Sequence, residues 1–377
     1  MTENLFVGLM SGTSVDSIDA VLIKCDQETG ESRLLQNHSA AIDSTTRDQI
    51  LSLCQDGTAE IERMGELDRH LGYLFADACL QLLSASQIEA GRITAIGSHG
   101  QTIRHRPPTQ SRTPNLAFTC QIGDPNTIAE VTGITTVADF RRRDIAAGGQ
   151  AAPLVPRFHQ AAFTAVDCNR AIVNIGGMAN VTVLKGGSLI AGYDTGPGNV
   201  LLDEWVQRHL GSRYDDGGNW ATTGTADKRL LETFLTHPYF QLPPPKSTGR
   251  ETFNLNWLDQ QLANCTPPPT PQDVQATLLE LTARSICQSL RSLATKPQEL
   301  YVCGGGAHNK KLMQTISTLL APIPVNSTAA LGIAPDWVEA SAFAWLASQT
   351  LQVRTGNSPV VTGAQRERIL GGIYCAG

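Results

Sequence analysis

Short apolar runs alternate with glycine-rich turns along most of the chain. The first run, residues 5–10, leads into the small-residue turn 11–14, and apolar residues return at 19–24. β-Branched and apolar residues on both sides of a Gly/Ser/Thr turn predict two strands joined in a hairpin. Further runs of this kind lie at 93–100, 134–140, 171–177, 181–184, 189–198 and 300–306. Most of these predicted strands end in glycine or a small polar residue, as strands that lead into functional loops often do.

Helical periodicity occupies four longer segments. In residues 58–89 the apolar positions, among them Leu67 and Leu71, recur at steps of three and four, which predicts a long amphipathic helix or a pair of helices. Similar patterns lie near 272–295, 308–320 and 337–352. Because predicted strands and helices interleave, the fold class is predicted to be α/β. The Pro-rich patches 242–247 and 266–271 predict loops around a region that the pattern does not assign.

The length of the chain favours two domains over one. A chain of 377 residues is longer than single hydrophobic cores usually grow. Segments 7–23 and 173–184 each place a Gly-containing polar turn between β-branched strands, which suggests two copies of one phosphate-holding device. Such turns are common, so the pattern alone is weak evidence for a duplication.

Charge and composition exclude several classes of partner. The net charge of −6 leaves no broad basic surface for nucleic acid. The N-terminus lacks the basic start and long apolar core of a signal peptide, and no run reaches the roughly 18 apolar residues of a membrane span. The nine cysteines include no C-x-x-C pair, which fits reduced thiols. We therefore expect a cytoplasmic protein that binds neither nucleic acid nor membrane.

Familiar nucleotide and hydrolase motifs are missing from the sequence. It contains no P-loop, no Rossmann G-x-G-x-x-G after a predicted strand, no G-x-S-x-G, no H-E-x-x-H and no EF-hand loop. The glycine-rich turns remain, because their backbone N–H groups can surround an anion where side chains do not crowd it. His99, His105 and His308 do not have metal-ligand spacing and are interpreted as hydrogen-bonding residues.

The first turn combines hydroxyls with carboxylates. Ser11, Thr13 and Ser14 are followed by Asp16 and Asp19. Hydroxyl and amide donors suit phosphate oxygens, and a nearby carboxylate can hold Mg²⁺ directly or through water. The alternative is a hairpin turn whose polar groups cap the backbone.

Two further segments carry candidate chemistry. Asp194 leaves an apolar strand and enters the turn 195–198, a position that suits a general base, with an ordinary Asx-turn as the alternative. Arg141 begins a run of three arginines flanked by Asp139 and Asp144. A run of this kind is usually a solvated or locally paired face.

Eight segments, taken in order, resemble the anhydro-N-acetylmuramic acid kinase family. They are GLMSGTSVDSID, GSHGQTIRH, ADFRRRDIAAGGQAAPLVP, NIGGMANVT, GYDTGPGNVLLD, KSTGRETFNLNWL, VCGGGAHN and GIAPDWVEASAFAWLA. The resemblance extends from about residue 5 to residue 372. Ser17 departs from the family pattern, because the family usually has Gly directly after the aspartate that is Asp16 in this sequence.

The resemblance implies two related domains of the actin-like ATPase (ribonuclease H-like) type, with a cleft between them for nucleotide and sugar. The implied domains are residues 1–133 and 134–377. The resemblance also allows the C-terminal end of the chain to return to the first domain. The implied ATP- and phosphate-binding residues are Gly12, Thr13, Ser14, Val15, Asp16, Ser17, Ile18, Asp19, Gly176, Gly177, Gly304, Gly305 and Gly306. Asp16 is the implied ligand of Mg²⁺, directly or through water, and the 302–309 turn lies on the adenosine side.

The resemblance also implies the reaction. The 1,6-anhydro bridge of 1,6-anhydro-N-acetylmuramic acid is opened by water and the γ-phosphate of ATP is placed on O6, with Asp194 as the catalytic base. Ser14, Arg141 and Glu339 are the implied sugar contacts, and a homodimer is the implied assembly. One alternative is a kinase that phosphorylates an existing sugar hydroxyl. Another is a nucleotide-gated sugar-binding regulator without turnover.

Overall fold

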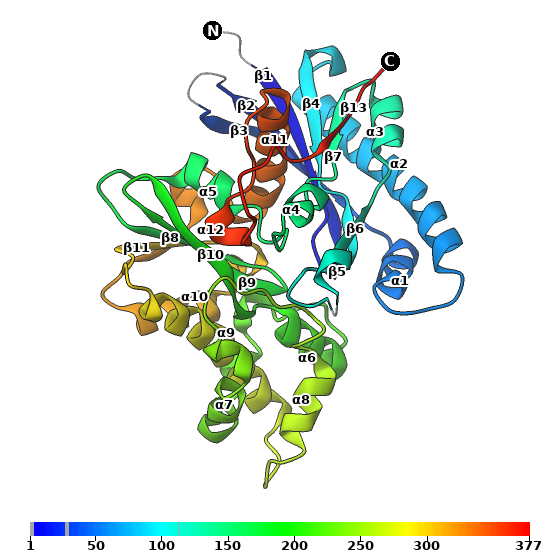
Figure 1. Cartoon of the computed structure of the whole chain (residues 1–377). Helices are drawn as coiled ribbons and strands as arrows, with labels where there is room; N and C mark the ends of the chain where they lie inside the picture. The colour runs from blue at the N-terminus through cyan, green and yellow to red at the C-terminus, as the bar shows by residue number, and fades with distance from the viewer. Residues whose placement is uncertain (1–3, 27–29, 112) are drawn as a thin grey trace. The chain divides into compact units, whose positions relative to one another are not determined.

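The chain folds into two compact units. The computed structural model describes residues 4–26, 30–111 and 113–377 (Figure 1). The first unit consists of Met1–Phe163 together with Trp337–Gly377, and the second consists of Thr164–Asp336. Both contain a sheet covered by helices, which confirms the predicted α/β class. All nine cysteines are free thiols.

The first unit is built on a six-stranded sheet. Its strands, in spatial order, are β13 (Gly372–Tyr374), β7 (Thr136–Ala138), β4 (Ile93–Ser98), β1 (Asn4–Met10), β2 (Ser17–Cys25) and β3 (Ser32–Ala41). β1, β2 and β3 form an antiparallel meander, while β4 pairs parallel to β1 and β7 parallel to β4. A separate pair, β5 (Gln101–Arg106) and β6 (Phe118–Ile122), follows β4 in the chain.

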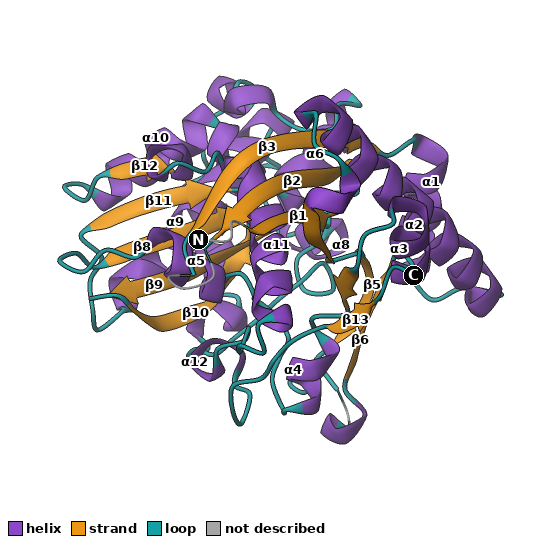
Figure 2. Ribbon diagram, turned by 90° about the horizontal axis from the view of Figure 1, so that it is seen from above, coloured by secondary structure: helices purple, strands orange, loops and turns teal. Residues whose placement is uncertain are grey.

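The second unit repeats this arrangement. Its strands, in spatial order, are β10 (Ser188–Pro197), β9 (Met178–Lys185), β8 (Arg170–Ile175), β11 (Glu299–Cys303) and β12 (Val325–Ser327) (Figure 2). β8, β9 and β10 form an antiparallel meander, and β11 and β12 continue parallel to β8. The five strands of this sheet have the order 3-2-1-4-5 of the ribonuclease H-like fold, and the first sheet has the same order with β13 added as a sixth strand beside β7. This match confirms the prediction of two related domains.

The helices cover these sheets. Those of the first unit are α1 (Ser44–Leu53), α2 (Glu60–Ser86), α3 (Pro125–Thr132), α4 (Arg142–Ala146), α5 (Pro156–Phe163), α11 (Val338–Leu351) and α12 (Pro359–Thr362). Those of the second are α6 (Val200–Leu210), α7 (Lys228–Leu235), α8 (Leu255–Leu262), α9 (Pro271–Ser292) and α10 (Lys310–Leu320). α2 is one long helix, and α9, α10 and α11 match the three other predicted helices. None of the helices in the described residues is long and apolar enough to cross a membrane.

Two glycines let α11 lie directly on the first sheet. A Cβ added to Gly8 would lie 2.0 Å from the carbonyl oxygen of Ala340, and one added to Gly97 would lie 2.0 Å from that of Phe343. Because successive strand residues point to opposite faces, the neighbours of Gly8 in β1, Val7 and Leu9, instead join the core beneath α2. The sheet is therefore packed on both faces, and the 337–377 segment belongs to the first unit.

The two units divide later in the chain than the predicted boundary at 133/134. β7 (Thr136–Ala138) pairs with β4 and so remains in the first sheet. α4 and α5 follow it, and the second unit begins at Thr164. The pairing of β7 with β4 thus keeps residues 136–138 in the first unit.

Candidate active site

The turn after β1 is anchored at both ends and exposed at its tip. Ser11 is buried and its hydroxyl donates to Oε1 of Gln101 at 2.7 Å. Val15 is buried with φ of 56°, a region that β-branched residues rarely adopt. Between them Gly12 is half-buried, while Thr13 and Ser14 are exposed. The turn therefore presents hydroxyl and backbone donors on a fixed frame, as phosphate binding requires.

The predicted 12–19 phosphate segment is split between this turn and β2. Asp16 lies in the turn, with one carboxylate oxygen 3.9 Å from Nε of Arg47. Asp19 lies in β2, where its Oδ1 accepts hydrogen bonds from the hydroxyls of Ser39 at 2.7 Å and Ser17 at 3.0 Å. Asp16 is thus the carboxylate nearer to the tip, whereas Asp19 joins the hydroxyls of the sheet.

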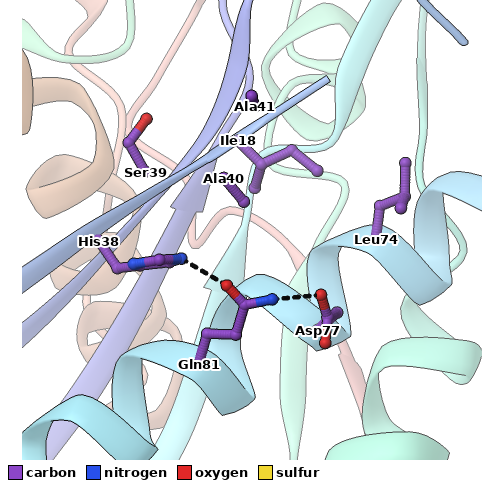
Figure 3. A pocket seen from close by; sticks show the side chains of 8 residues that line it. All are labelled: Ile18, His38, Ser39, Ala40, Ala41, Leu74, Asp77 and Gln81. Atoms are coloured by element: carbon purple, nitrogen blue, oxygen red, sulfur yellow. Dashed lines mark hydrogen bonds between the residues drawn. The ribbon is translucent and has the colours of Figure 1, made fainter. Parts of the chain in front are cut away.

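A hollow of about 310 Å³ lies near this segment, between β3 and α2 (Figure 3). It is lined by Ile18, His38, Ser39, Ala40, Ala41, Leu74, Asp77 and Gln81. Oε1 of Gln81 accepts a hydrogen bond from Nε2 of His38 at 2.8 Å, and the Gln81 amide N–H donates to Asp77 at 2.6 Å. These polar side chains satisfy one another, and the lining includes neither Thr13 nor Ser14.

In the second unit, the glycine turn after β8 is joined to the start of α6. Gly176 accepts a hydrogen bond from the N–H of Asn199 at 2.8 Å, and Gly177 accepts one from Gly198 at 2.9 Å. A Cβ on Gly198 would lie 2.3 Å from the Gly176 carbonyl oxygen, so this approach requires glycine.

The glycine turn after β11 meets the end of β8. Gly304 has φ of 76°, and a Cβ there would lie 2.3 Å from Oδ1 of Asn174, a buried atom without a hydrogen-bond partner among the described residues. The turn ends at Asn309, whose side chain caps α10 by accepting from the N–H of Leu312 at 3.0 Å. Because β8 and β11 are parallel neighbours, the two predicted glycine turns of the second unit lie together.

Asp194 is held near the end of β10 by neighbouring segments. Its side chain is mostly buried, and Oδ2 accepts the backbone N–H of Thr248 at 3.0 Å. Its own N–H donates to the Lys246 carbonyl at 3.1 Å, and its carbonyl accepts from the Tyr239 hydroxyl at 2.6 Å. A β-bulge between Asp194 and Gly196 turns the strand at this point. The carboxylate is therefore restrained in direction, as a general base must be.

The charge of Asp194 acts on two titratable neighbours. Burial raises the pKa of the Tyr239 hydroxyl far above its usual range, and the negative charge of Asp194 adds to this effect. Burial lowers the pKa of the Lys246 ammonium, while Asp194 opposes that change. No motif in the sequence connects Lys246 or Thr248 with Asp194, because both contacts are made by backbone atoms of a separate segment.

Arg141 is half-buried in the first unit. Its Nε donates to Nε2 of His99 at 2.9 Å and its NH1 donates to the Ala151 carbonyl at 2.6 Å. Since Nε2 of His99 accepts, the imidazole carries its proton on Nδ1, which donates to the Gly100 carbonyl at 2.8 Å. Burial first, and then the Arg141 charge, keep the pKa of His99 well below its usual value. Arg141 is thus oriented by a neutral histidine.

A buried carboxylate holds the loop that carries Ala151. Asp144 accepts hydrogen bonds from the N–H of Ala151 at 2.8 Å, from Asn357 at 2.7 Å and from Thr362 at 2.8 Å. Of the other residues in the arginine run, Arg142 pairs with Asp139, while Arg143 is exposed. The run is therefore locally paired in part, as its composition indicated.

The predicted site residues divide between the units. The turn 12–19, Arg141 and Glu339 belong to the first unit, and Glu339 lies half-buried in the first turn of α11. The glycines at 176–177 and 304–306, and Asp194, belong to the second. Each unit thus contributes at least one glycine-containing turn between a strand and the next element.

The matching family model and the most similar relatives agree on one family. The family model for anhydro-N-acetylmuramic acid kinase matches residues 4–376. A protein of that name from Saccharophagus degradans is 51% identical over 374 residues, covering 99% of this chain and 100% of the relative. One from Shewanella woodyi is 50% identical over 377 residues, covering 100% of both chains. Among solved structures, component A of the Acidaminococcus fermentans (R)-2-hydroxyglutaryl-CoA dehydratase is similar with a TM-score of 0.47 and 10% identity, over 92% of this chain and 99% of that chain.

Proposed function

Because this chain belongs to the anhydro-N-acetylmuramic acid kinase family, we propose that it couples two steps on 1,6-anhydro-N-acetylmuramic acid. Water opens the 1,6-anhydro bridge, and O6 receives the γ-phosphoryl group of ATP. The products are N-acetylmuramic acid 6-phosphate and ADP. The chain is a phosphotransferase, as its family membership states. We place the reaction in peptidoglycan recycling and amino-sugar catabolism.

The restrained carboxylate of Asp194 is the observation that carries this proposal. Asp194 takes a proton from a water molecule, whose oxygen bonds to the anomeric carbon. The bond from that carbon to O6 breaks, and its electron pair stays on O6. O6 then bonds to the γ-phosphorus as the bond to the ADP oxygen breaks. The phosphoryl group replaces the proton on the leaving oxygen, so no separate general acid is needed.

Phosphate binding in the proposal is shared among the glycine turns. The exposed tip with Thr13 and Ser14 supplies hydroxyl and backbone donors, and Gly176, Gly177 and residues 304–306 supply backbone without obstructing side chains. Positioning and electrostatic stabilisation make up most of the catalysis of phosphoryl transfer. Rigid turns with well-packed ends suit that role.

Asp16 fits the expected site of Mg²⁺. Within the described residues no group of three or more His, Cys, Asp or Glu side chains could hold a metal ion. Mg²⁺ that accompanies nucleotide phosphates needs fewer protein ligands, since it usually keeps water and binds one or two carboxylates plus phosphate oxygens. The Asp16 carboxylate is 43% exposed beside the turn and can serve in this way. When bound there, Mg²⁺ would offset phosphate charge.

Arg141 is proposed to bind the lactyl carboxylate of the sugar, with Ser14 and Glu339 as further sugar contacts. Replacing Arg141 with Ala is expected to lower kcat/KM for 1,6-anhydro-N-acetylmuramic acid about 10- to 100-fold, because hydrogen bonds to charged groups contribute about 1.5–3 kcal/mol. The loss should be small for 1,6-anhydro-N-acetylglucosamine, which has no lactyl group. Steady-state kinetics with both sugars measure this difference.

The exposed Arg143 supplies the matched control, since it belongs to the same arginine run. Arg143→Ala should leave both kcat/KM values near those of the unmodified protein. Equal losses on both sugars in Arg141→Ala would instead assign Arg141 a structural role, through His99 and Ala151.

The product distinguishes the proposal from its alternatives. The protein is incubated with ATP, Mg²⁺ and 1,6-anhydro-N-acetylmuramic acid, and ADP and sugar products are quantified. One ring-opened sugar 6-phosphate per ADP supports the proposal. Phosphorylation that leaves the anhydro ring intact identifies a sugar kinase acting on an existing hydroxyl, and sugar binding without ADP formation identifies a regulator.

We also propose a cytoplasmic homodimer that acts on these two small molecules and has no nucleic-acid or membrane partner. The net charge of −6 and the free cysteines agree with this assignment. Light scattering on the purified protein tests the assembly. A molar mass twice that of one chain is expected, and a mass equal to one chain contradicts the dimer.

A further inference from the structure

A loop segment lies against the edge strand that carries Asp194. β10 is the outermost strand of its sheet, and Lys246–Thr248 (the 246–248 segment) contacts it at Asp194. The Lys246 carbonyl accepts the Asp194 N–H at 3.1 Å, and the Thr248 N–H donates to Asp194 Oδ2 at 3.0 Å. The segment thus binds both the backbone and the side chain of the proposed base.

The Lys246 ammonium is fixed beside this contact. Its Nζ donates to the Tyr239 carbonyl at 3.2 Å and lies 4.7 Å from the centre of the Tyr239 ring. Tyr239 in turn donates its hydroxyl to the Asp194 carbonyl. Tyr239 therefore contacts both the Lys246 ammonium and the backbone of Asp194.

Lys246 is a charged neighbour of Asp194 in the second unit. β9 contributes the amide of Asn180 opposite Asp194, and α9 contributes the Ser285 hydroxyl near the following bulge. Burial raises the pKa of Tyr239 far above neutrality, so its hydroxyl stays uncharged. The Lys246 ammonium is therefore a cationic neighbour of the carboxylate, and its pKa is itself sensitive to Asp194.

The 246–248 segment also carries two buried hydroxyls that its surroundings do not satisfy. Oγ of Ser247 and Oγ1 of Thr248 have no hydrogen-bond partner in the part of the chain that the structure describes. A buried hydroxyl without a partner is unfavourable. A molecule bound beside the proposed base would remove this cost by forming hydrogen bonds with the hydroxyls of Ser247 and Thr248.

We propose that the 246–248 segment positions the catalytic base: the Thr248 N–H fixes Oδ2 of Asp194, and Lys246 holds a positive charge beside the carboxylate. Lys246 and Thr248 are positioning residues, since they act through Asp194. This inference rests on the proposed function of Asp194. The charge state of the base then depends on Lys246, which lies in a separate loop.

The pH dependence of kcat/KM tests the role of Lys246. Without the cation the Asp194 carboxylate loses a favourable interaction, its pKa rises, and a larger share is protonated at a given pH. Lys246→Met, which keeps the length of the side chain, should move the acidic limb of the profile up by about one pH unit. Lys246→Arg should restore the limb to its original pH.

Two further variants complete the test. Lys185→Met removes an exposed lysine at the end of β9 and should leave the profile unchanged. Lys246→Gln replaces Lys246→Met if the latter unfolds at a lower temperature. An acidic limb that stays in place in the folded neutral variants overturns the inference. Failure of the proposed function is distinguishable, because the unmodified protein would then open no anhydro ring at any pH.

Discussion

Asp194→Asn is expected to lower kcat for coupled ring opening and phosphoryl transfer by about 10²–10⁴-fold or more, the usual contribution of a positioned base. The amide oxygen of Asn can still accept the Thr248 N–H, so the local hydrogen bond is retained. What the variant loses is the ability to take a proton from water. ADP release and sugar phosphate formation, measured in the same assay, should fall together.

Asp216→Asn is the matched control, because Asp216 is an exposed aspartate of the second unit. It should keep the kcat of the unmodified protein. Circular dichroism of both variants checks that they are folded. A folded Asp194→Asn protein with full turnover would remove Asp194 from the role of base and favour a mechanism in which another group activates the water.

Gly8→Ala is expected to destabilise the first unit by about 3 kcal/mol, at the upper end of the usual cost of overpacking. The added Cβ would lie 2.0 Å from the Ala340 carbonyl oxygen and 2.9 Å from the Ala344 nitrogen. Both are backbone atoms of α11, so rotation of a side chain cannot relieve the clash. A lower midpoint of thermal unfolding measures the effect.

Gly65→Ala should change stability in the opposite direction. Gly65 lies in α2 on its exposed side, and a Cβ there would meet no atom within 4 Å. Alanine inside a helix is more stable than glycine by about 0.5–1 kcal/mol. The same substitution thus tests two environments. Equal shifts in both variants would contradict the close packing of α11 on β1.

Local sequence patterns predicted the elements whose periodicity is strong. The apolar run and small-residue turn near the N-terminus became β1, its turn and β2, and the 272–295 pattern became α9. β3 (Ser32–Ala41) was missed, because its residues are alternately half-buried and exposed, without a fully buried face. Pairing with β2, and not an apolar pattern of its own, makes this segment a strand.

Local sequence patterns do not predict how the chain divides into its two units. Trp337–Gly377 returns to the first unit because glycines at 8 and 97 admit α11 onto that sheet. Neither glycine is distinguishable in sequence from those of the turns. The contact becomes visible only when residues far apart in the chain, Gly8 with Ala340 and Gly97 with Phe343, are seen together.

The candidate site was predicted in part. The carboxylate of Asp194 and the glycine turns stand out in the sequence, since their residue types suit their proposed roles. The partner of that carboxylate does not, because Thr248 lies 54 residues later and contributes a backbone N–H that any residue except proline would have. For Asp19 the sequence is misleading in the other direction. Its spacing assigns it to the phosphate turn, whereas in the structure its carboxylate accepts hydrogen bonds from the hydroxyls of Ser17 and Ser39.

The most direct test of the account follows one oxygen atom. The protein is incubated with ATP, Mg²⁺ and 1,6-anhydro-N-acetylmuramic acid in H₂¹⁸O, and mass spectrometry locates label and phosphate in the product. We expect one ¹⁸O on the anomeric carbon and the phosphate on O6. A phosphorylated sugar whose anhydro ring is intact, or a product without label at the anomeric carbon, would contradict the coupled attack by water.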